Sequence, residues 1–234
     1  MKRGCHFILK LVIVLLFFSS TSYALEYGFS AGFGLSYINS KGLNRVTEGL
    51  DSGYVTSFGK INFPLNFEGD FFLGFGNSSI GLGMGYEFTS RNSYSDVYKV
   101  TQDLSYKSIP VFLKYRYLYF ENNRFSMALG GGAGILYSKL SMSTRPSPQN
   151  SDVYGMKAWG AVITAENNFY YTVSNNIRFF STVGLRYAKT GSFSYTSDTA
   201  KHSSGEKVQF SDGSTLTLNL TGLKFLIGIM MNWS

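Results

Sequence analysis

Residues 25–38 read LEYGFSAGFGLSYI, and their side chains alternate between two kinds. Apolar residues occupy the odd positions from Leu25 to Tyr37, whereas the even positions carry mostly Gly and Ser. Successive side chains of a β-strand point to opposite faces, so the alternation predicts a strand with one apolar face. In a soluble sandwich the other face would carry charged or large polar groups, and here it is mostly small. The surroundings must therefore be apolar on one side and crowded on the other.

The same alternation recurs along the chain and predicts eight strands in total. Each is at least as long as the roughly 9 to 11 residues that a tilted transmembrane strand requires. The seven other segments are approximately 63–75, 80–88, 109–119, 125–137, 157–171, 177–187 and 223–233.

The connections between these segments alternate in length. Residues 76–79, 121–124 and 172–176 are short, turn-rich links, and long polar segments lie near 39–54, 90–107, 139–155 and 189–214. Strands that run up and down place all short links at one end of the sheet. In hydrocarbon the sheet must also close, because a free edge leaves peptide groups without hydrogen-bond partners. The pattern predicts an all-β fold, an eight-stranded antiparallel up-and-down transmembrane β-barrel.

An eight-stranded barrel is only just wide enough for side chains to fill it, which explains Gly and Ser on the inner face. Glycines at 81, 83 and 85 and at 130, 132 and 134 fit this account, and they lack the spacing of a nucleotide-binding loop. Aromatic residues gather near the short links and predict a girdle at that membrane interface. Pro64 cannot donate to a strand ladder, so we expect a bulge or break there, and the start of the second strand is left open.

The first 24 residues are typical of an export signal. Basic residues precede the apolar run LVIVLLFF at 11–18, and small residues end at Ala24, where we expect cleavage. The predicted division is a signal peptide over 1–24 and a barrel domain over 25–234. Cys5 leaves with the signal, so no disulfide or thiolate metal site is expected in the exported chain. The net charge of +7 is spread without a Lys/Arg run, which excludes nucleic acid as an expected partner.

Three segments carry a family resemblance: SIPVFLKYRY at 108–117, GGGAGILY at 130–137 and LKFLIGIMMNW at 223–233. They resemble the small outer-membrane β-barrel domain proteins of Gram-negative bacteria, a group often labelled porin family. The resemblance covers nearly all of the exported chain, and it implies an eight-stranded barrel in the cell outer membrane. It also implies recognition of the last strand by the barrel insertion machinery, which usually reads a terminal aromatic residue. Here Ser234 follows Trp233.

Catalysis is the first function to consider, because several outer-membrane enzymes are barrels that use histidine as a general base. The exported chain has one histidine, His202, in a polar segment with Asp198, Ser203 and Ser204 nearby. A catalytic triad requires fixed geometry on a rigid scaffold, which a loop tip does not supply. We expect no catalytic residues, no cofactor and no metal site, and a lipid-modifying outer-membrane enzyme is kept as an alternative behind a narrow solute channel.

Charges on the inner face decide the second question, whether the barrel conducts. In a narrow lumen these groups should pair across the barrel, because an uncompensated buried ion costs several kcal/mol. The prediction is a packed lumen, with a narrow solute channel as the alternative. The residues expected in this network are Glu26, Glu68, Asp70, Glu87, Lys114, Arg116, Arg178, Arg186 and Lys224.

The long connections offer a third role, structural or binding work at the cell surface. Aromatic loop tips can anchor a partner, and the candidates are Tyr94, Tyr98, Tyr154, Phe193 and Tyr195. The alternative is that strand hairpins extend above the membrane and these rings pack on one another. The expected partners are outer-membrane lipid, the insertion machinery and an unidentified extracellular ligand, with the barrel as a monomer.

Overall fold

The computed structural model describes residues 25–38, 63–95, 100–146, 152–197, 203–210 and 212–233. The predicted signal peptide lies outside these residues. No described helix is long and apolar enough to cross a bilayer. The described strands are β1 (Leu25–Ile38), β2 (Leu65–Phe75), β3 (Ser78–Ser95), β4 (Val100–Glu121), β5 (Phe125–Pro146), β6 (Asp152–Ser174), β7 (Ile177–Thr190), β8 (Ser194–Tyr195) and β9 (Gly222–Trp233).

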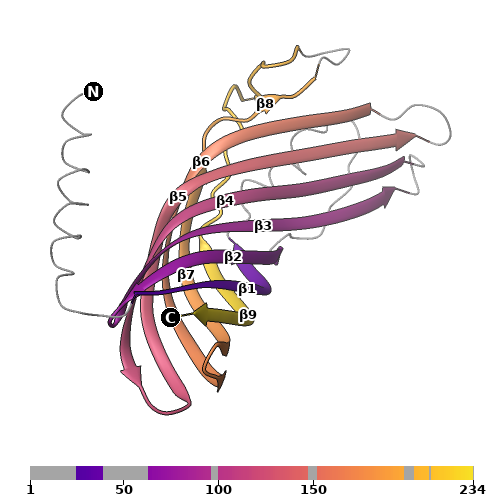
Figure 1. The fold of residues 1–234 in the computed structure, drawn as a ribbon. Helices are drawn as coiled ribbons and strands as arrows, with labels where there is room; N and C mark the ends of the chain where they lie inside the picture. The colour runs from indigo at the N-terminus through magenta and orange to yellow at the C-terminus, as the bar shows by residue number, and fades with distance from the viewer. Residues whose placement is uncertain are drawn as a thin grey trace, which may run out of the picture.

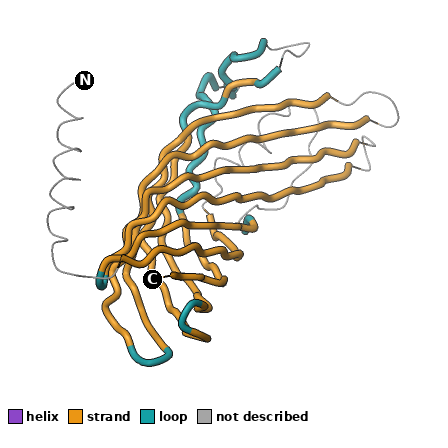
Figure 2. Tube along the Cα trace, in the orientation of Figure 1, coloured by secondary structure: helices purple, strands orange, loops and turns teal. Residues whose placement is uncertain are grey.

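Eight long strands form a closed antiparallel ring (Figure 1). Consecutive long strands pair throughout, short β8 pairs with β6, and the ring closes where β9, next to β7, also pairs with β1. Paired residues followed once around the ring from Leu25 return to β1 at Leu35, ten residues farther along. Such a stagger tilts the strands by about 40° to the barrel axis. The predicted eight-stranded up-and-down ring is confirmed, and almost all of it is strand (Figure 2).

The two faces of each strand have the environments that the alternation predicts. Outward side chains remain exposed although they are large and apolar, as at Leu82 (61%), Leu113 (65%) and Leu185 (63%). Ser30 and Ser36, on the inner parity of β1, are 2% and 0% exposed. An apolar surface this extensive marks contact with a membrane or partner rather than with water.

Four strands are longer than the sequence pattern indicated. Most of 90–107 and 139–155, which we expected as loops, belongs to β3, β4, β5 and β6, and these strands reach 18 to 23 residues. They rise together as a curved sheet beyond the ends of β1, β2 and β9 (Figure 1). The alternation continues there, since Leu104, Tyr106 and Leu140 all face the interior and are buried.

Prolines interrupt pairing at two places. The second strand begins at Leu65, directly after Pro64, whose carbonyl accepts a hydrogen bond from the Ser36 amide at 3.1 Å. The expected break at Pro64 therefore marks the strand start. Pro110 lies inside β4, and the β3–β4 register passes from the Met84 pair to the Glu87 pair without pairs between them. A proline in this ladder removes one N–H donor, and neighbouring pairs keep the strands together.

Aromatic residues flank the apolar band at both ends. At the short-turn end Tyr27 stacks on Trp233, with ring centroids 5.9 Å apart. At the opposite end Tyr137 contacts Trp159 at 5.0 Å, and Tyr37 contacts Phe63 at 5.3 Å. Rings with a polar tip favour the membrane interface, so these two levels bound the hydrocarbon region.

Glycine permits the closest approach of strands where the ring closes. A Cβ at Gly34 would collide with the backbone carbonyl of Phe225 on β9, and one at Gly222 would collide with that of Tyr37 on β1. Both positions belong to the β1–β9 seam. The seam thus requires the absence of a side chain at both positions.

We predict that Gly34→Ala weakens closure of the ring. The added methyl group forces the β1 and β9 backbones apart, and overpacking of this kind costs about 1–3 kcal/mol. Gly69→Ala is the matched control, because a Cβ there would lie 3.5 Å from the Phe29 ring, an ordinary contact. The measurement is the denaturant midpoint of barrels refolded in lipid vesicles. Equal midpoints for the two variants would contradict the assigned seam.

Candidate functional site

The centre of the lumen holds eight buried charged side chains from six strands. Four are acidic and four are basic, so their formal charges cancel. Each is no more than 8% exposed. They are Glu68 and Asp70 of β2, Glu87 of β3, Lys114 and Arg116 of β4, Glu166 of β6, Arg186 of β7 and Lys224 of β9. We call this set the lumen network.

Two lysines from opposite walls share the same carboxylates. Lys224 Nζ lies 3.0 Å from Glu68 Oε2 and also pairs with Glu166. Lys114 Nζ lies 2.9 Å from Asp70 Oδ1 and pairs with Glu68. Charge-assisted bonds of this kind strengthen where water is excluded. They tie β2, β4, β6 and β9 together across the lumen.

Two arginines complete the lumen network. Arg116 pairs with Asp70, which also accepts a hydrogen bond from Ser30 Oγ at 3.1 Å. Arg186 pairs with Glu87 one level farther out. Ser108 Oγ donates to Glu87 Oε2 at 2.9 Å, which satisfies the second carboxylate oxygen.

Apolar layers enclose the lumen network on both sides. Toward the short turns lie Phe72, Ala128, Tyr170 and Met230, packed with Leu118 and Phe180. On the other side, the Phe112 ring lies 5.3 Å from Lys114 Nζ and 5.8 Å from Lys224 Nζ. Phe112 belongs to a larger apolar cluster, which extends along the lumen away from the short turns.

The described chain between β7 and β9 contributes to that larger cluster, because it pairs with the outer parts of β6 and β7 and shares the core of the barrel wall. We call residues 191–197, 203–210 and 212–221 the outer cap. Its side chains Phe193, Val208, Leu216, Leu218 and Leu220 are at most 1% exposed. They share one core with inward residues of the barrel wall: Ile38, Leu104, Tyr106, Phe112, Leu136, Leu140, Met142, Met156, Ala158, Val162 and Ala188.

Backbone hydrogen bonds fix the outer cap to the wall and to itself. The Gly191 amide donates to the Trp159 carbonyl at 2.7 Å, and the Leu220 amide donates to the Ala188 carbonyl at 2.8 Å. Within the cap, Phe193 donates to Leu216 at 3.0 Å. The cap is therefore a packed part of the fold over the outer end.

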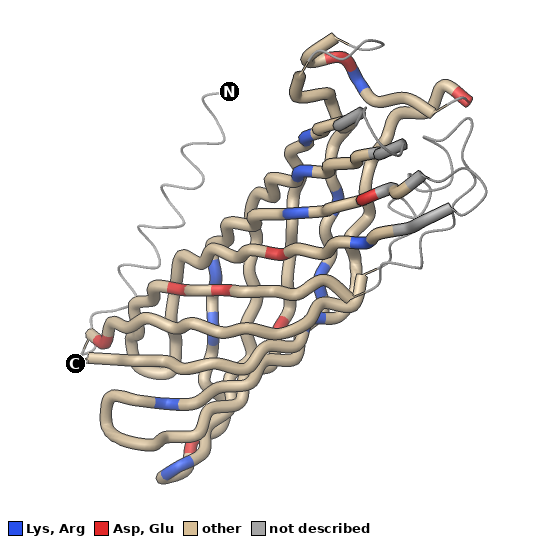
Figure 3. The backbone as a smooth tube through the Cα atoms, turned by 90° about the vertical axis from the view of Figure 1, so that its right-hand side faces the viewer, with Lys and Arg blue, Asp and Glu red and all other residues tan. Residues whose placement is uncertain are grey.

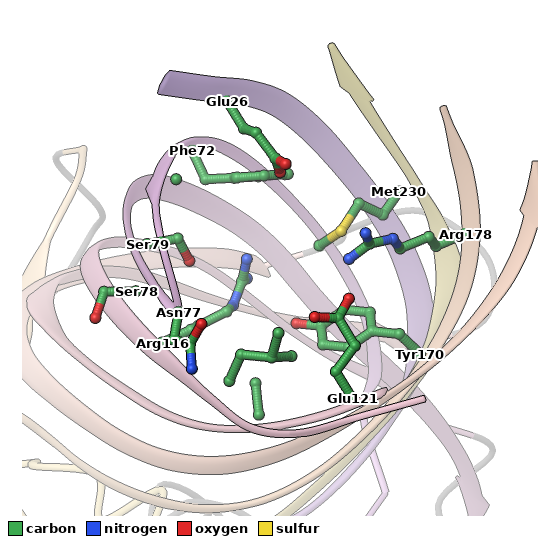
Figure 4. A pocket seen from close by; sticks show the side chains of 14 residues that line it. Glu26, Phe72, Asn77, Ser78, Ser79, Arg116, Glu121, Tyr170, Arg178 and Met230 are labelled. Carbon is green, nitrogen blue, oxygen red and sulfur yellow. The ribbon is translucent and has the colours of Figure 1, made fainter. Parts of the chain in front are cut away.

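A small vestibule of about 130 Å³ opens at the short-turn end (Figure 4). Arg116 and Arg178 line it together with Glu26, Glu121 and Tyr170, and Phe72 and Met230 contribute to its apolar lining. Its two acids and two bases leave no net charge, and its apolar lining belongs to the inner apolar layer.

The structure brings seven of the nine predicted network residues together. Glu26 and Arg178 line the vestibule, as Arg116 also does, because Glu26 and Arg178 are each the second residue of their strand at the short-turn end. Glu166 was not among the predicted residues, although it lies on the inward-facing side of β6 between buried Thr164 and Asn168. Parity alone could have found it.

The five aromatic candidates for loop binding have different surroundings. Phe193 and Tyr195 are 0% and 4% exposed in the core of the outer cap, and Tyr154 packs against that core. Burial raises the pKa of the Tyr195 phenol above its ordinary value, and the Glu206 charge acts in the same direction. Tyr94 lies on β3. Tyr98, His202 and Asp198 lie outside the described residues.

No group of three metal-ligating side chains occurs in the described parts of the chain. The lumen network has the chemistry of a structural element, since each of its charged groups has an opposite charge as its partner.

We predict that Lys224→Met destabilises the folded barrel by about 3–5 kcal/mol, because it leaves Glu68 and Glu166 with one compensating charge too few. The double variant Glu166→Gln/Lys224→Met restores charge balance and should recover part of the loss. Arg124→Met, at an exposed turn, is the matched control. Urea midpoints in vesicles measure all three. A double variant less stable than Lys224→Met would argue against charge balance as the reason.

No known protein-family profile matches the chain, and no curated protein matches it in sequence. Solved structures do match in fold. A major outer membrane protein from Thermus thermophilus is 12% identical, with a TM-score of 0.54 over 90% of this chain and 100% of that one. OprG from Pseudomonas aeruginosa gives a TM-score of 0.46 at 15% identity, over 90% and 97% of the two chains. Ail from Yersinia pestis, in complex with a heparin analogue, gives 0.41 at 14%, over 89% and 99%.

Identities this low show the fold alone, and of these three only the Thermus structure is similar enough to carry weight. Its match covers most of this chain and all of that one, and this chain forms a ring of eight long strands. The outward apolar band and its two aromatic levels have the arrangement that such barrels use in lipid. The chain therefore has the fold of the small outer-membrane β-barrels, an eight-stranded antiparallel up-and-down transmembrane barrel.

Proposed function

We propose that this protein is a non-conducting barrel of the outer membrane, with a structural or binding role at the cell surface. The observation that carries the proposal is the filled lumen. From the short turns outward, an inner apolar layer, the lumen network and the core of the outer cap follow one another. Export by residues 1–24, insertion through β9 and a monomeric state complete the proposal.

A conducting pore needs a continuous wet path and groups that bind an ion only weakly. Here the charged groups bind each other, and apolar side chains pack on both sides of them. The vestibule lies at the short-turn end, where Arg116 of the network and Phe72, Tyr170 and Met230 of the inner apolar layer line it. These features argue against a solute channel of the porin kind.

Catalysis has little support among the described residues. The buried acids and bases of the lumen network are held in ion pairs, which leaves no free general base within the network. Ser203 lies on an exposed tip, where a nucleophile would be open to water. The proposal is therefore non-enzymatic.

The outer part of the barrel supports the surface role. The extended β3–β6 sheet and the outer cap form one packed body that carries exposed tips at Ser203–Glu206 and at Asp212–Gly213. Binding residues concentrate on loops held by a rigid scaffold. Any contact residues would then be exposed tip and edge residues, because Phe193 and Tyr195 belong to the core.

We predict that the purified protein shows no sustained high conductance in planar bilayers, since paired charges and apolar side chains of the described strands occupy the lumen. Single-channel recording measures this directly, with a general porin as the positive control. Long-lived openings of uniform size would overturn the proposal.

Single cysteines test the same property by chemistry. Ser30→Cys places a thiol beside Asp70 inside the lumen, and Ser203→Cys places one on an exposed tip. We expect a charged methanethiosulfonate reagent to label the tip at least about a hundredfold faster, because a buried thiol is reached only through local opening. Comparable rates would show a water-accessible lumen.

A further inference from the structure

Four lysines lie on neighbouring strands at the outer end of the apolar band, and the fourth, Lys189, is in register with Ala161 rather than with Lys157. Each is exposed. Each lies two residues beyond an apolar or aromatic residue of its own strand, in the direction away from the short turns. The successive pairs are Ile109 and Lys107 on β4, Tyr137 and Lys139 on β5, Trp159 and Lys157 on β6, and Tyr187 and Lys189 on β7. Figure 3 shows basic positions beside one another on adjacent strands toward that end.

Three of these lysines are direct cross-strand neighbours. Lys107 pairs in register with Lys139, and Lys139 pairs with Lys157. We call Lys107, Lys139 and Lys157 the lysine row. Side chains directly opposite in an antiparallel sheet have Cβ atoms about 4.5–5.5 Å apart, and like charges there destabilise the sheet.

The lysine row has no acidic partner among the described residues. The next acid along β4, Asp103, lies four residues farther out and accepts a hydrogen bond from Ser143. The repulsion within the row is thus left without compensation by the described parts of the protein. An external anion held against this face would remove the repulsion.

The depth of the lysine row indicates which anion that is. Tyr137 and Trp159, whose rings are in contact, mark the outer membrane interface. On the same two strands, Lys139 and Lys157 follow two residues farther from the short turns. Lipid headgroups lie at this level, and a basic residue near an anionic membrane surface gains about fivefold in binding. Lys–phosphate bonds are also charge-assisted.

We propose that the lysine row, extended by Lys189 on β7, is a docking site for the phosphate-bearing headgroup of an outer-leaflet lipid. The lipid chains lie along the apolar band below, and the phosphate lies across β4, β5 and β6. The site would orient one flank of the barrel toward anionic lipid. This goes beyond the proposed surface role, which does not depend on it.

Trp159 is a built-in reporter of this lipid. The chain has two tryptophans, so Trp233→Phe leaves Trp159 alone, next to the lysine row. In vesicles of phosphatidylcholine, quenching by dibrominated phosphatidic acid is compared with quenching by dibrominated phosphatidylcholine. The ratio gives the relative association constant of the phosphate headgroup at this flank.

We expect clear selectivity for phosphatidic acid in the Trp233→Phe protein and a loss of roughly tenfold or more in the triple variant Lys107→Gln/Lys139→Gln/Lys157→Gln. The triple Arg variant, which keeps the charge, should retain selectivity. Lys139→Gln should lower it, whereas Arg124→Gln, at a short-turn position, should not. In phosphatidylcholine alone, the triple Gln variant should unfold at the same or a higher denaturant concentration, because it loses the repulsion.

Unchanged selectivity in the triple Gln variant would overturn the proposal, as would equal quenching by both lipids in the starting protein. Inorganic phosphate at millimolar concentration distinguishes the source of the anion. If it abolishes selectivity, the row is a site for free phosphate and the lipid assignment is wrong. If selectivity persists, the headgroup in its membrane is the ligand.

Discussion

Closure of the sheet is the constraint on which the rest of the structure depends. In hydrocarbon an open edge would leave a row of peptide groups without partners, at several kcal/mol each. The β1–β9 pairing supplies those partners over twelve register positions, from Tyr27 with Trp233 to Ile38 with Gly222. Once the ring is closed, each strand has one face in lipid and one in the lumen. The apolar band, the small inner residues and the lumen charges all follow from that division.

Filling the interior is a second requirement, because eight strands enclose a narrow space that side chains must occupy. Glycine admits the close contacts, as where Phe180 packs against Gly32 and Gly228. The charged residues fit there only because acids and bases cancel and approach one another across the lumen. A balanced buried network does not add stability by its presence, but it makes each partner costly to remove. With the outer cap above it, the network leaves a body that is suited to holding a surface in place and unsuited to passing solutes.

The sequence predicted what depends on local alternation. The alternation of side chains predicted the strands, their lipid-facing side and seven members of the lumen network. A two-residue period can be read from the sequence alone. Four features depended on tertiary structure. Polar outward residues hid the continuation of β3–β6 above the membrane, and Pro110 is tolerated because the neighbouring pairs of the ladder remain. Phe193 and Tyr195 looked exposed because nothing local shows that residues 191–197 pair with β6 and place these rings in the core. The lysine row is visible only in the register, since its members are 32 and 18 residues apart in sequence.

Amide hydrogen exchange of the protein in lipid vesicles tests closure most directly, with the β1–β9 seam compared with the β4–β5 pair. The account predicts slow exchange at Phe29, Ala31 and Phe33 on β1, at rates like those of Leu113 and Tyr115 on β4. All of these residues lie within paired strands in the apolar band. Fast exchange confined to β1 and β9 would show an open edge and contradict the closed barrel.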